Sequence, residues 1–522
     1  MQKLRQALNR ATYGVTETLL KRVQALGWDA WVEQQLKPGT DAACETRIRN
    51  LRYTMEKDER EVESGIERYY ESATQLVSRL EKGKEPEDFY YEQPAIETAL
   101  ATWTRAIHSE RQVEELMAEF WHNHFNVSVD ADDEVSLTLG VYDREVIRKH
   151  ALGNFREFLE AVATSTAMLY YLDNVHSKAS PANENYAREL FELHTLGADA
   201  YYNDQYSDWK QVPGALEGQA EGYIDEDVYE AARAFTGWTV GNGEERHDRK
   251  FPLTGAFYYY DHWHDHYQKR ILGREFKSHQ DAMADGRAVL DMVAHHPATA
   301  RHLCTKLCRW WVADDPLQSI VDKAVRAWNQ HASASDQIAR TISTILRSPE
   351  FEAQLGQKLK RPNHLLVSLV RVLNINLLPS TEWYWLLEQM GWRQFSWPTP
   401  TGHPDAAAYW LGTNMVLKRW NSIPSLLWMH LEEGNDSMLS DVVNALPNLR
   451  MDTLLDFWSM RLMGSRLEGA ARARVKAKAM EELEELPNED WAWLAEHEPE
   501  ALEHKLIQLV SLLALLPEFQ KR

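Results

Sequence analysis

Helical periodicity runs through most of this 522-residue chain, and it limits the folds that the chain can adopt. Apolar residues recur at every third or fourth position over residues 15–175, 226–240 and 280–522, which places them on one face of successive α-helices. A typical segment begins near Thr16 and ends at Gly27, because glycine readily closes a helix. The pattern therefore predicts a mainly α protein, built as a large irregular helical bundle.

Several stretches interrupt this pattern. Residues 197–225 are rich in Gly, Tyr and Asp and predict a long ordered loop, the kind of segment that often serves a site. Residues 240–273 contain the aromatic run FYYYDHWHDHY, which predicts a small β hairpin. We expect exposed helices and a loop in the charged residues 55–94, an irregular segment in the Pro-rich residues 394–404, and a solvated helical surface in the acidic residues 480–500.

No repeat and no long low-complexity linker marks a domain boundary. We expect a helical core at residues 1–330 that carries the histidine and glutamate motifs, the long loop and the hairpin. Residues 331–522 are expected to form a C-terminal helical part that packs on this core, so that the chain makes one continuous unit.

The composition excludes some classes of partner. The chain has 57 Lys and Arg against 79 Asp and Glu, a net charge of −22, and no basic face, which argues against a nucleic-acid partner. The first residues, MQKLRQALNRATYG, lack the apolar core of a signal peptide, and no run of about 18 apolar residues exists. We therefore expect a cytoplasmic chain without a membrane partner.

Three cysteines, Cys44, Cys304 and Cys308, are too few for a disulfide framework. Cys304 and Cys308 are spaced i, i+4 inside a helical pattern, where two thiolates could hold a metal ion. No second Cys/His pair lies nearby, so buried core thiols are the favoured interpretation.

The first segment that could carry chemistry is ELMAEFWHNHF, residues 115–125. Glu119 and His122 form an E-x-x-H pair, the spacing with which helical bundles present two ligands to iron. His124 lies in the middle of the apolar face of the same helix. The segment alone favours an exposed Glu–His pair beside one core histidine. His122 and His124 could converge on one ion only if the helix ends there.

The second segment is a helix that we expect to begin after Ser180, with Pro181 in its first turn and Gly197 past its end. Periodicity gives it an acidic arc and an apolar arc, and His194 lies on the apolar one. Periodicity alone favours an amphipathic helix with a solvated acidic face. However, two histidines on buried faces, His124 and His194, are what a metal site in a bundle core would require. The acidic arc holds Glu184, Asn185, Arg188, Glu189 and Glu192.

The third segment is DHWHDH, residues 261–266. If the backbone is extended, His262, His264 and His266 project to one side and the two aspartates to the other. Three alternating histidines suffice for a surface metal site, but an exposed polar sequence explains the run equally well. Whether this segment folds over His124 and His194 stays open at this point.

Together these segments resemble DUF1800, a bacterial family named for its lack of an assigned function. The resemblance covers nearly the whole chain and is carried by LNRATYG, EFWHNHFNVS, NENYARELFELHTLG, YIDEDVYEAARAFTGW, HDHYQKRILG, HPATARHLCTKLCRWWV, KRPNHLL and PTPTGHP. The family's motif residues fall on His122, Asn123, His124, Asn183, Glu184, Asn185, Arg188, Glu189, Glu192, His194, Thr236, Gly237, Trp238, His264, Asp265 and Lys269.

A few positions depart from the family pattern. Glu119 stands where an apolar residue is more usual, Tyr267 replaces a glycine, and His403 replaces an aromatic residue. His262 and His266 lie outside the motif, so His264 ranks above them. The resemblance implies a DUF1501-type protein partner, because family members are often encoded beside one. Members also often look exported, whereas this chain shows no export signal.

The main functional hypothesis is a metal-dependent enzyme, with oxidative chemistry slightly favoured over hydrolytic. Histidine and carboxylate ligands without thiolate suit a divalent ion of iron, manganese or zinc. The candidate metal ligands are His122, His124, His194, His264, Asp265 and Glu184. The candidate catalytic residues are Glu189 and Glu192 as ligands or general base, Arg188 as an anion holder, and Lys269 as a nearby charge.

The alternative is a non-catalytic binding or assembly protein, in which a buried His/Glu/Arg network only fixes the fold. A hydrolase with a Ser or Cys nucleophile is poorly supported, because the chain has no G-x-S-x-G elbow. No nucleotide or flavin motif is present either. The substrate is unknown, and the many Trp and Tyr residues near the motifs suit an aromatic or peptide substrate and a large core equally.

Overall fold

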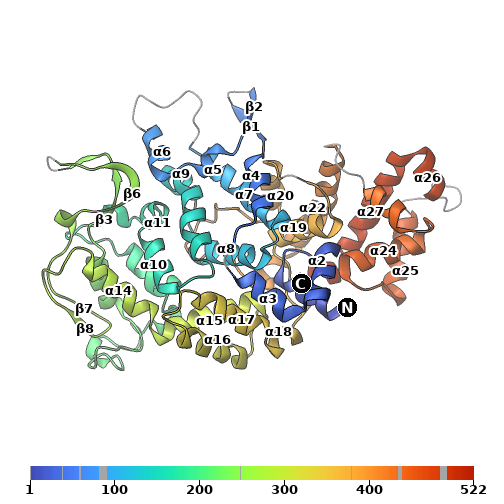
Figure 1. The fold of residues 1–522 in the computed structure, drawn as a ribbon. Helices are drawn as coiled ribbons and strands as arrows, with labels where there is room; N and C mark the ends of the chain where they lie inside the picture. The colour runs from blue at the N-terminus through green and yellow to red at the C-terminus, as the bar shows by residue number, and fades with distance from the viewer. Residues whose placement is uncertain are drawn as a thin grey trace.

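The computed structural model describes residues 2–37, 39–57, 60–80, 91–246, 249–377, 379–432, 438–481 and 491–522. These residues are mainly helical, as predicted, and their strands form only short antiparallel pairs (Figure 1). Figure 1 shows α8 (Gln112–His124) near the middle of the molecule, with the strands β3 (Trp238–Asn242), β6 (Leu253–Tyr259), β7 (Lys269–Ile271) and β8 (Arg274–Phe276) toward one end and the last helices toward the other.

The helices of the first half are α1 Gln2–Ala11, α2 Glu17–Leu26, α3 Trp28–Leu36, α4 Ala42–Arg49, α5 Glu67–Tyr70, α6 Ala73–Val77, α7 Gln93–His108, α8 Gln112–His124, α9 Asp133–Val141, α10 Phe155–Ala163, α11 Thr166–Tyr171, α12 Asn185–Glu189 and α13 Asp225–Ala234. Those of the second half are α14 Ala284–Ala294, α15 Pro297–Trp311, α16 Gln318–Gln330, α17 Gln337–Leu346, α18 Pro349–Ala353, α19 Pro362–Leu373, α20 Glu382–Gln389, α21 Ala407–Trp410, α22 Thr413–Glu432, α23 Met438–Ala445, α24 Met451–Met463, α25 Gly469–Glu481, α26 Trp491–His497, α27 Pro499–Ala514 and α28 Pro517–Gln520. Two π-helical segments, η2 Tyr142–Arg148 and η4 Leu190–His194, continue α9 and α12.

The predicted hairpin is present, with β3 Trp238–Asn242 paired to β6 Leu253–Tyr259. The shorter pairs are β4 Glu245–Arg246 with β5 Arg249–Lys250, and β7 Lys269–Ile271 with β8 Arg274–Phe276. Asp261–Trp263 forms a 3-10 turn, so the extended backbone considered for the DHWHDH histidines is absent. A further pair, β1 Tyr53–Lys57 with β2 Arg60–Ser64, lies in the stretch predicted as helices and a loop; residues 81–90 of that stretch lie outside the described residues.

One large cluster of buried apolar side chains joins the two halves of the chain, and indoles fill much of it. Trp103 and Trp121 of the first half and Trp383 and Trp458 of the second are all completely buried. Cys304 and Cys308 are buried free thiols, as expected. Among the described residues, no helix has the length and apolarity needed to cross a bilayer.

Helix α8 is enclosed on nearly all sides, since ten of its thirteen residues are buried. It packs against α1, α3, α7 and the π-helical segment η2. The helix ends at His124, with Phe125 as its C-cap, so the chain does leave the helix directly after the second histidine. The side chains after His124 therefore no longer follow the helical spacing of α8.

The helix expected after Ser180 begins later, at Asn185. The reason is the side chain of Asn183, whose Oδ1 accepts a hydrogen bond from the backbone N–H of Asn185 at 3.0 Å, the short-range bond that starts a helix. Its Nδ2 donates to the carboxylate of Asp173 at 2.7 Å. Gly197 closes the segment as predicted, with a φ of +90°, and its N–H donates to the carbonyl of Phe191.

We expect Asn183→Ala to lower the free energy of unfolding by about 1 kcal/mol, because it removes this start and the link to Asp173. Ser180→Ala is the matched control. Ser180 is exposed and lies ahead of the helix, so its variant should differ from the wild type by less than about 0.5 kcal/mol. Urea unfolding of both variants measures the difference; a larger effect of Ser180→Ala would contradict the start at Asn185.

Candidate functional site

His124 lies in a buried cluster of three histidines and one lysine: His124, His194, His302 and Lys306, here called the histidine–lysine cluster. Nδ1 of His124 is 2.8 Å from Nζ of Lys306, and its Nε2 is 3.1 Å from the backbone carbonyl of His194. A carbonyl can only accept, so Nε2 carries the proton and Nδ1 accepts from the lysine. Burial lowers the pKa of His124 well below its ordinary value, and the charge of Lys306 lowers it further.

His194 is completely buried, and neither of its ring nitrogens has a hydrogen-bond partner among the described residues. Its ring centroid lies 6.0 Å from that of His124 and 5.1 Å from that of Phe125. Burial lowers its pKa to about 3, with a further contribution from the charge of Lys306. The structure therefore brings His124 and His194 together, and it leaves His194 neutral and unpaired.

Lys306 and His302 come from α15, and sequence reasoning missed both. Burial lowers the pKa of Lys306 to about 8; Asp405 acts to raise it, while Arg309 and Arg361 lower it. His302 donates through Nε2 to the carbonyl of Leu193, 3.1 Å away. The i, i+4 spacing of these two residues in HLCTK was the available signal, since it places both on one face of a helix.

His122 points elsewhere, to a buried ion-pair network. Its Nε2 lies 2.8 Å from Oδ1 of Asp143, whose carboxylate also accepts from Nε of Arg148 at 2.9 Å. Arg148 in turn binds Glu115 at 2.6 Å. Burial acts to raise the pKa of Asp143, but Arg148 and the hydrogen bond from His122 hold it well below its ordinary value. His122 and His124 consequently do not converge.

The π-helical backbone of η2 explains why Asp143 and Arg148 meet. Side chains five positions apart come onto one face when the helix widens to i→i+5 hydrogen bonds. An ordinary α-helix would turn Arg148 away from Asp143. The geometry that holds His122 thus depends on a backbone form that periodicity does not predict.

Glu119 is also buried, with a side chain only 9% exposed. Its Oε2 accepts from the hydroxyl of Tyr13 at 2.6 Å and from Nδ2 of Asn363 at 3.1 Å. Nε2 of His364 lies 3.3 Å from the same oxygen. Glu119 and His122 therefore have different partners and do not form the exposed pair that the E-x-x-H spacing suggested.

Two asparagines after His122 hold the Pro-rich segment 394–404 against α8. Asn123 donates to the carbonyl of His403 at 3.0 Å and accepts from its N–H at 2.6 Å. Asn126 donates to the carbonyls of Trp397 and Thr399. Gly402 fits here because an added Cβ would lie 2.2 Å from the carbonyl oxygen of Asn123. The irregular segment is thereby fixed beside the buried polar groups.

The acidic arc of the second segment lies half-buried at the surface. Arg188 binds Asp225 at 3.1 Å and Glu184 at 3.3 Å. Burial raises the pKa of Glu189, and the neighbouring charge of Glu192 raises it further. Arg188 does hold carboxylates, but these are carboxylates of the chain itself.

The residues predicted from the third segment form a separate polar cluster that joins β7, α13 and α14. His264 has Nδ1 2.9 Å from the carbonyl of Thr236, and its Nε2 is 3.4 Å from Asp285. Lys269 is fully buried and binds Asp285 at 2.7 Å. Asp265 is paired with Arg233 at 2.8 Å.

The candidate ligands therefore lie in several surroundings. His124 and His194 share one, while His122, the surface Glu184, and His264 with Asp265 each lie among other partners. In the described ranges, no group of three or more His, Cys, Asp or Glu side chains is arranged to hold a metal ion.

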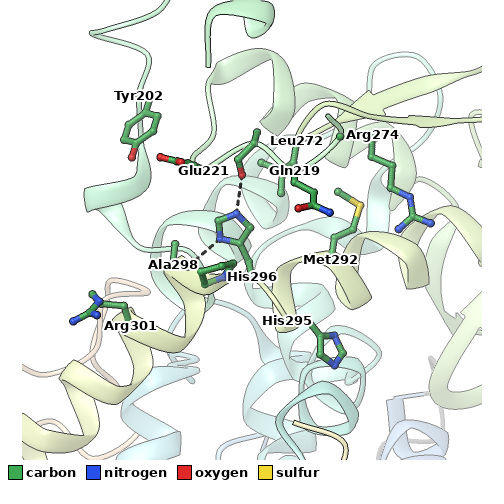
Figure 2. A pocket seen from close by; sticks show the side chains of 13 residues that line it. Tyr202, Gln219, Glu221, Leu272, Arg274, Met292, His295, His296, Ala298 and Arg301 are labelled. Atoms are coloured by element: carbon green, nitrogen blue, oxygen red, sulfur yellow. Dashed lines mark hydrogen bonds between the residues drawn. The ribbon is translucent and has the colours of Figure 1, made fainter. Parts of the chain in front are cut away.

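A large hollow lies apart from these groups, between the loop 197–225, α14 and the start of α15 (Figure 2). Its volume is about 910 Å³. Figure 2 shows His296 at its centre, where Nε2 bonds the carbonyl of Ala220 at 2.8 Å and Nδ1 accepts from the N–H of Ala298. Ala298 is about 12 Å along α15 from Lys306. None of the predicted residues lines this hollow, so size alone does not mark the reactive centre.

We expect Asp143→Asn to lower the free energy of unfolding by about 3 kcal/mol at neutral pH, because Arg148 keeps its buried charge and loses one of its two carboxylate partners. The pKa of Asp143 lies below its ordinary value of 3.8 when folded. Its contribution is therefore complete above that value and is lost as the pH falls through the folded pKa, so the two proteins should converge in acid.

Glu145→Gln is the control, since Glu145 lies in the same segment with an exposed side chain. Its effect should stay below about 0.5 kcal/mol. Denaturant unfolding at several pH values measures both variants. An Asp143→Asn protein as stable as the control would contradict the network.

Comparison with known proteins identifies the family but not the reaction. The model of the family described as "Protein of unknown function (DUF1800)" matches residues 6–521, essentially the whole chain. No curated protein and no solved structure matches the chain. This protein belongs to the DUF1800 family.

Proposed function

We propose that this protein is an enzyme that moves a proton to or from a small anionic substrate, with Lys306 as the base and His124 as the residue that positions it. The observation that carries the proposal is the 2.8 Å contact between Nζ of Lys306 and Nδ1 of a neutral, buried His124. The pKa of this lysine, about 8, lies in the range where an amine can both accept and release a proton near neutral pH.

Among the described residues, two buried lysines, Lys269 and Lys358, are neutralised by carboxylates, whereas a third, Lys360, lies over the ring of Phe519 without one. Lys269 binds Asp285 at 2.7 Å, and Lys358 binds Asp314 at 2.6 Å. In the described part of the chain, no carboxylate lies within ion-pair distance of Lys306, although its side chain is largely withdrawn from water. What distinguishes Lys306 from these lysines is its neutral imidazole partner, which leaves the amine able to take up a proton, and this pairing supports a chemical role.

The arrangement supports proton transfer in a simple way. The lone pair of His124 Nδ1 accepts one N–H of the amine, which holds the amine in place while its own lone pair remains free. Arg309 and Arg361 favour the uncharged amine, and the exposed Arg309 attracts an anion. The amine then takes the substrate proton and becomes an ammonium ion. The roles predicted for Glu189, Glu192, Arg188 and Lys269 remain predictions outside this pair.

We expect the Lys306 amine to react with acetic anhydride with a midpoint near pH 8, against an ordinary value of 10.5. Mass spectrometry of the modified peptide over a pH series measures this midpoint. Arg309→Gln should raise it, because the exposed Arg309 lowers the pKa of Lys306. A midpoint near 10.5 that Arg309→Gln leaves unchanged would support the non-catalytic alternative, in which the cluster only fixes the fold.

A metal-dependent enzyme is the second candidate, and the unpaired ring nitrogens of His194 favour it. A divalent iron, manganese or zinc ion bound by His194 and His124 would need Nδ1 of His124, which Lys306 occupies. Metal binding therefore requires the ammonium group to leave, and the two cations compete.

We expect Lys306→Met to bind a divalent ion more tightly than the wild type if this second candidate holds, because Nδ1 becomes free. Elemental analysis of untagged protein, and melting temperature with added iron, manganese or zinc, measure the effect. His194→Ala in the Lys306→Met background is the control and should abolish it. If neither the wild type nor Lys306→Met contains metal or melts at a higher temperature with added metal, the metal-dependent candidate is wrong and metal-free proton transfer remains.

A further inference from the structure

The carboxylate of Glu119 is held in an unequal way. Oε2 is surrounded by Tyr13, Asn363 and His364, as described above, whereas Oε1 is buried and has no hydrogen-bond partner among the described residues. Burial acts to raise the pKa of this group, but His364 and Arg361 keep it well below its ordinary value, so the carboxylate is charged. A charged oxygen without a partner is expensive inside a protein.

The side chain of Asn363 supplies a second buried acceptor without a hydrogen-bond partner among the described residues. Its Nδ2 donates to Glu119 at 3.1 Å, and this bond fixes the amide orientation, because the reverse one would bring two oxygens together. Oδ1 then faces away from Glu119. It is buried and has no partner in the described ranges.

Thr102 of α7 adds a third oxygen, since its buried Oγ1 also lacks a partner in that part of the chain. Thr102, Glu119 and Asn363 all line one cavity. Its volume is about 30 Å³, which suffices for a small ion or for one or two water molecules. Trp392 and Phe395 form part of its wall.

We propose that this cavity binds a small monovalent cation, K⁺, Na⁺ or an ammonium group, through the oxygens of Glu119, Asn363 and Thr102. Two of these oxygens can only accept, and one is charged, so they require a donor or a positive ligand and exclude an anion. One carboxylate matches a single positive charge, and the aromatic wall is favourable for a cation. Mg²⁺ would need a near-ideal octahedral set that three oxygens in this space do not supply.

The positive charges nearby do not oppose this assignment. Arg361 is turned to Asp405, with Nη2 2.9 Å from its carboxylate, and its guanidinium stacks over Trp310 at 4.3 Å. Arg361 thus binds a second carboxylate directly and acts on Glu119 only through its charge, so Oε1 of Glu119 still has no hydrogen-bond partner among the described residues. The site shares no residue with the histidine–lysine cluster, so a test of the cation site and a test of the proposed function have independent outcomes.

The test is the melting temperature of the full chain in KCl, NaCl and NH₄Cl, against choline chloride at equal ionic strength. Choline is too large for the cavity and controls for salt effects. We expect a saturable rise with at least one small cation, because a ligand that binds only the folded state stabilises it. A rise with NH₄⁺ but not with K⁺ or Na⁺ would assign the site to an ammonium group of a larger molecule.

Two variants locate the effect. Glu119→Gln should abolish the rise, and Thr102→Val should raise the half-saturating concentration at least tenfold. Thr102→Val removes an unpaired hydroxyl, so the variant should fold even if Glu119→Gln does not. Thr104→Val is its matched control on α7, because the Thr104 hydroxyl bonds the carbonyl of Leu100 at 2.7 Å; this variant should keep the full cation response.

Equal shifts in choline chloride would overturn the proposal, as would a response that Thr102→Val leaves unchanged. A rise with Ca²⁺ or Mg²⁺ alone would overturn the assignment to a monovalent ion. If no cation shifts the wild type while Thr102→Val melts higher in every salt, a water molecule fills the cavity and the proposal is wrong.

Discussion

The burial of α8 is the constraint on which the rest of this structure depends. Four ionisable side chains that are withdrawn from water, Glu115, Glu119, His122 and His124, lie on a helix that is enclosed on nearly all sides. Buried polar groups destabilise a protein unless they are paired, so each of the four requires a partner from another segment. The partners come from η2, from the N-terminal region, from α19 and from α15, and they fix how these parts surround α8.

The two π-helical segments both serve this arrangement. In η2 the wider turn places Arg148 beside Asp143, and the carboxylate of Asp143 also forms a hydrogen bond with Nε2 of His122. The segment η4 ends at His194, whose backbone carbonyl accepts a hydrogen bond from Nε2 of His124. π-helical turns are rare, because an α-helix is the more stable local form. Those that persist occur often at functional sites. Each segment bonds one histidine near the end of α8, which agrees with the proposed functional centre there.

The sequence predicted what depends on local pattern. Periodicity gave the helical fold, placed His124 and His194 on buried faces, and allowed the helix to end at His124, because each of these follows from neighbours within a few residues. The start of the second helix was missed, since Ser180 and Asn183 are both good capping residues and the sequence does not rank them.

Partners far apart in the chain could not be predicted. Glu119 meets Asn363 across 244 positions, and His124 meets Lys306 across 182. No rule of spacing connects such pairs. The same limit explains why His264, one of the candidate ligands, lies in a separate polar cluster with Thr236 and Asp285. Residue type indicated which side chains need partners, but only the fold shows which partners they have.

The central claim is that a neutral His124 accepts a hydrogen bond from Lys306 in the middle of the molecule. Nitrogen-15 NMR of protein labelled at histidine tests it most directly, because the ring shifts distinguish the two tautomers and the protonated form. The account predicts a neutral His124 at pH 6 with the proton on Nε2, and a shift at Nδ1 when Lys306 is replaced by Met. A protonated ring at pH 6, or a proton on Nδ1, would contradict it.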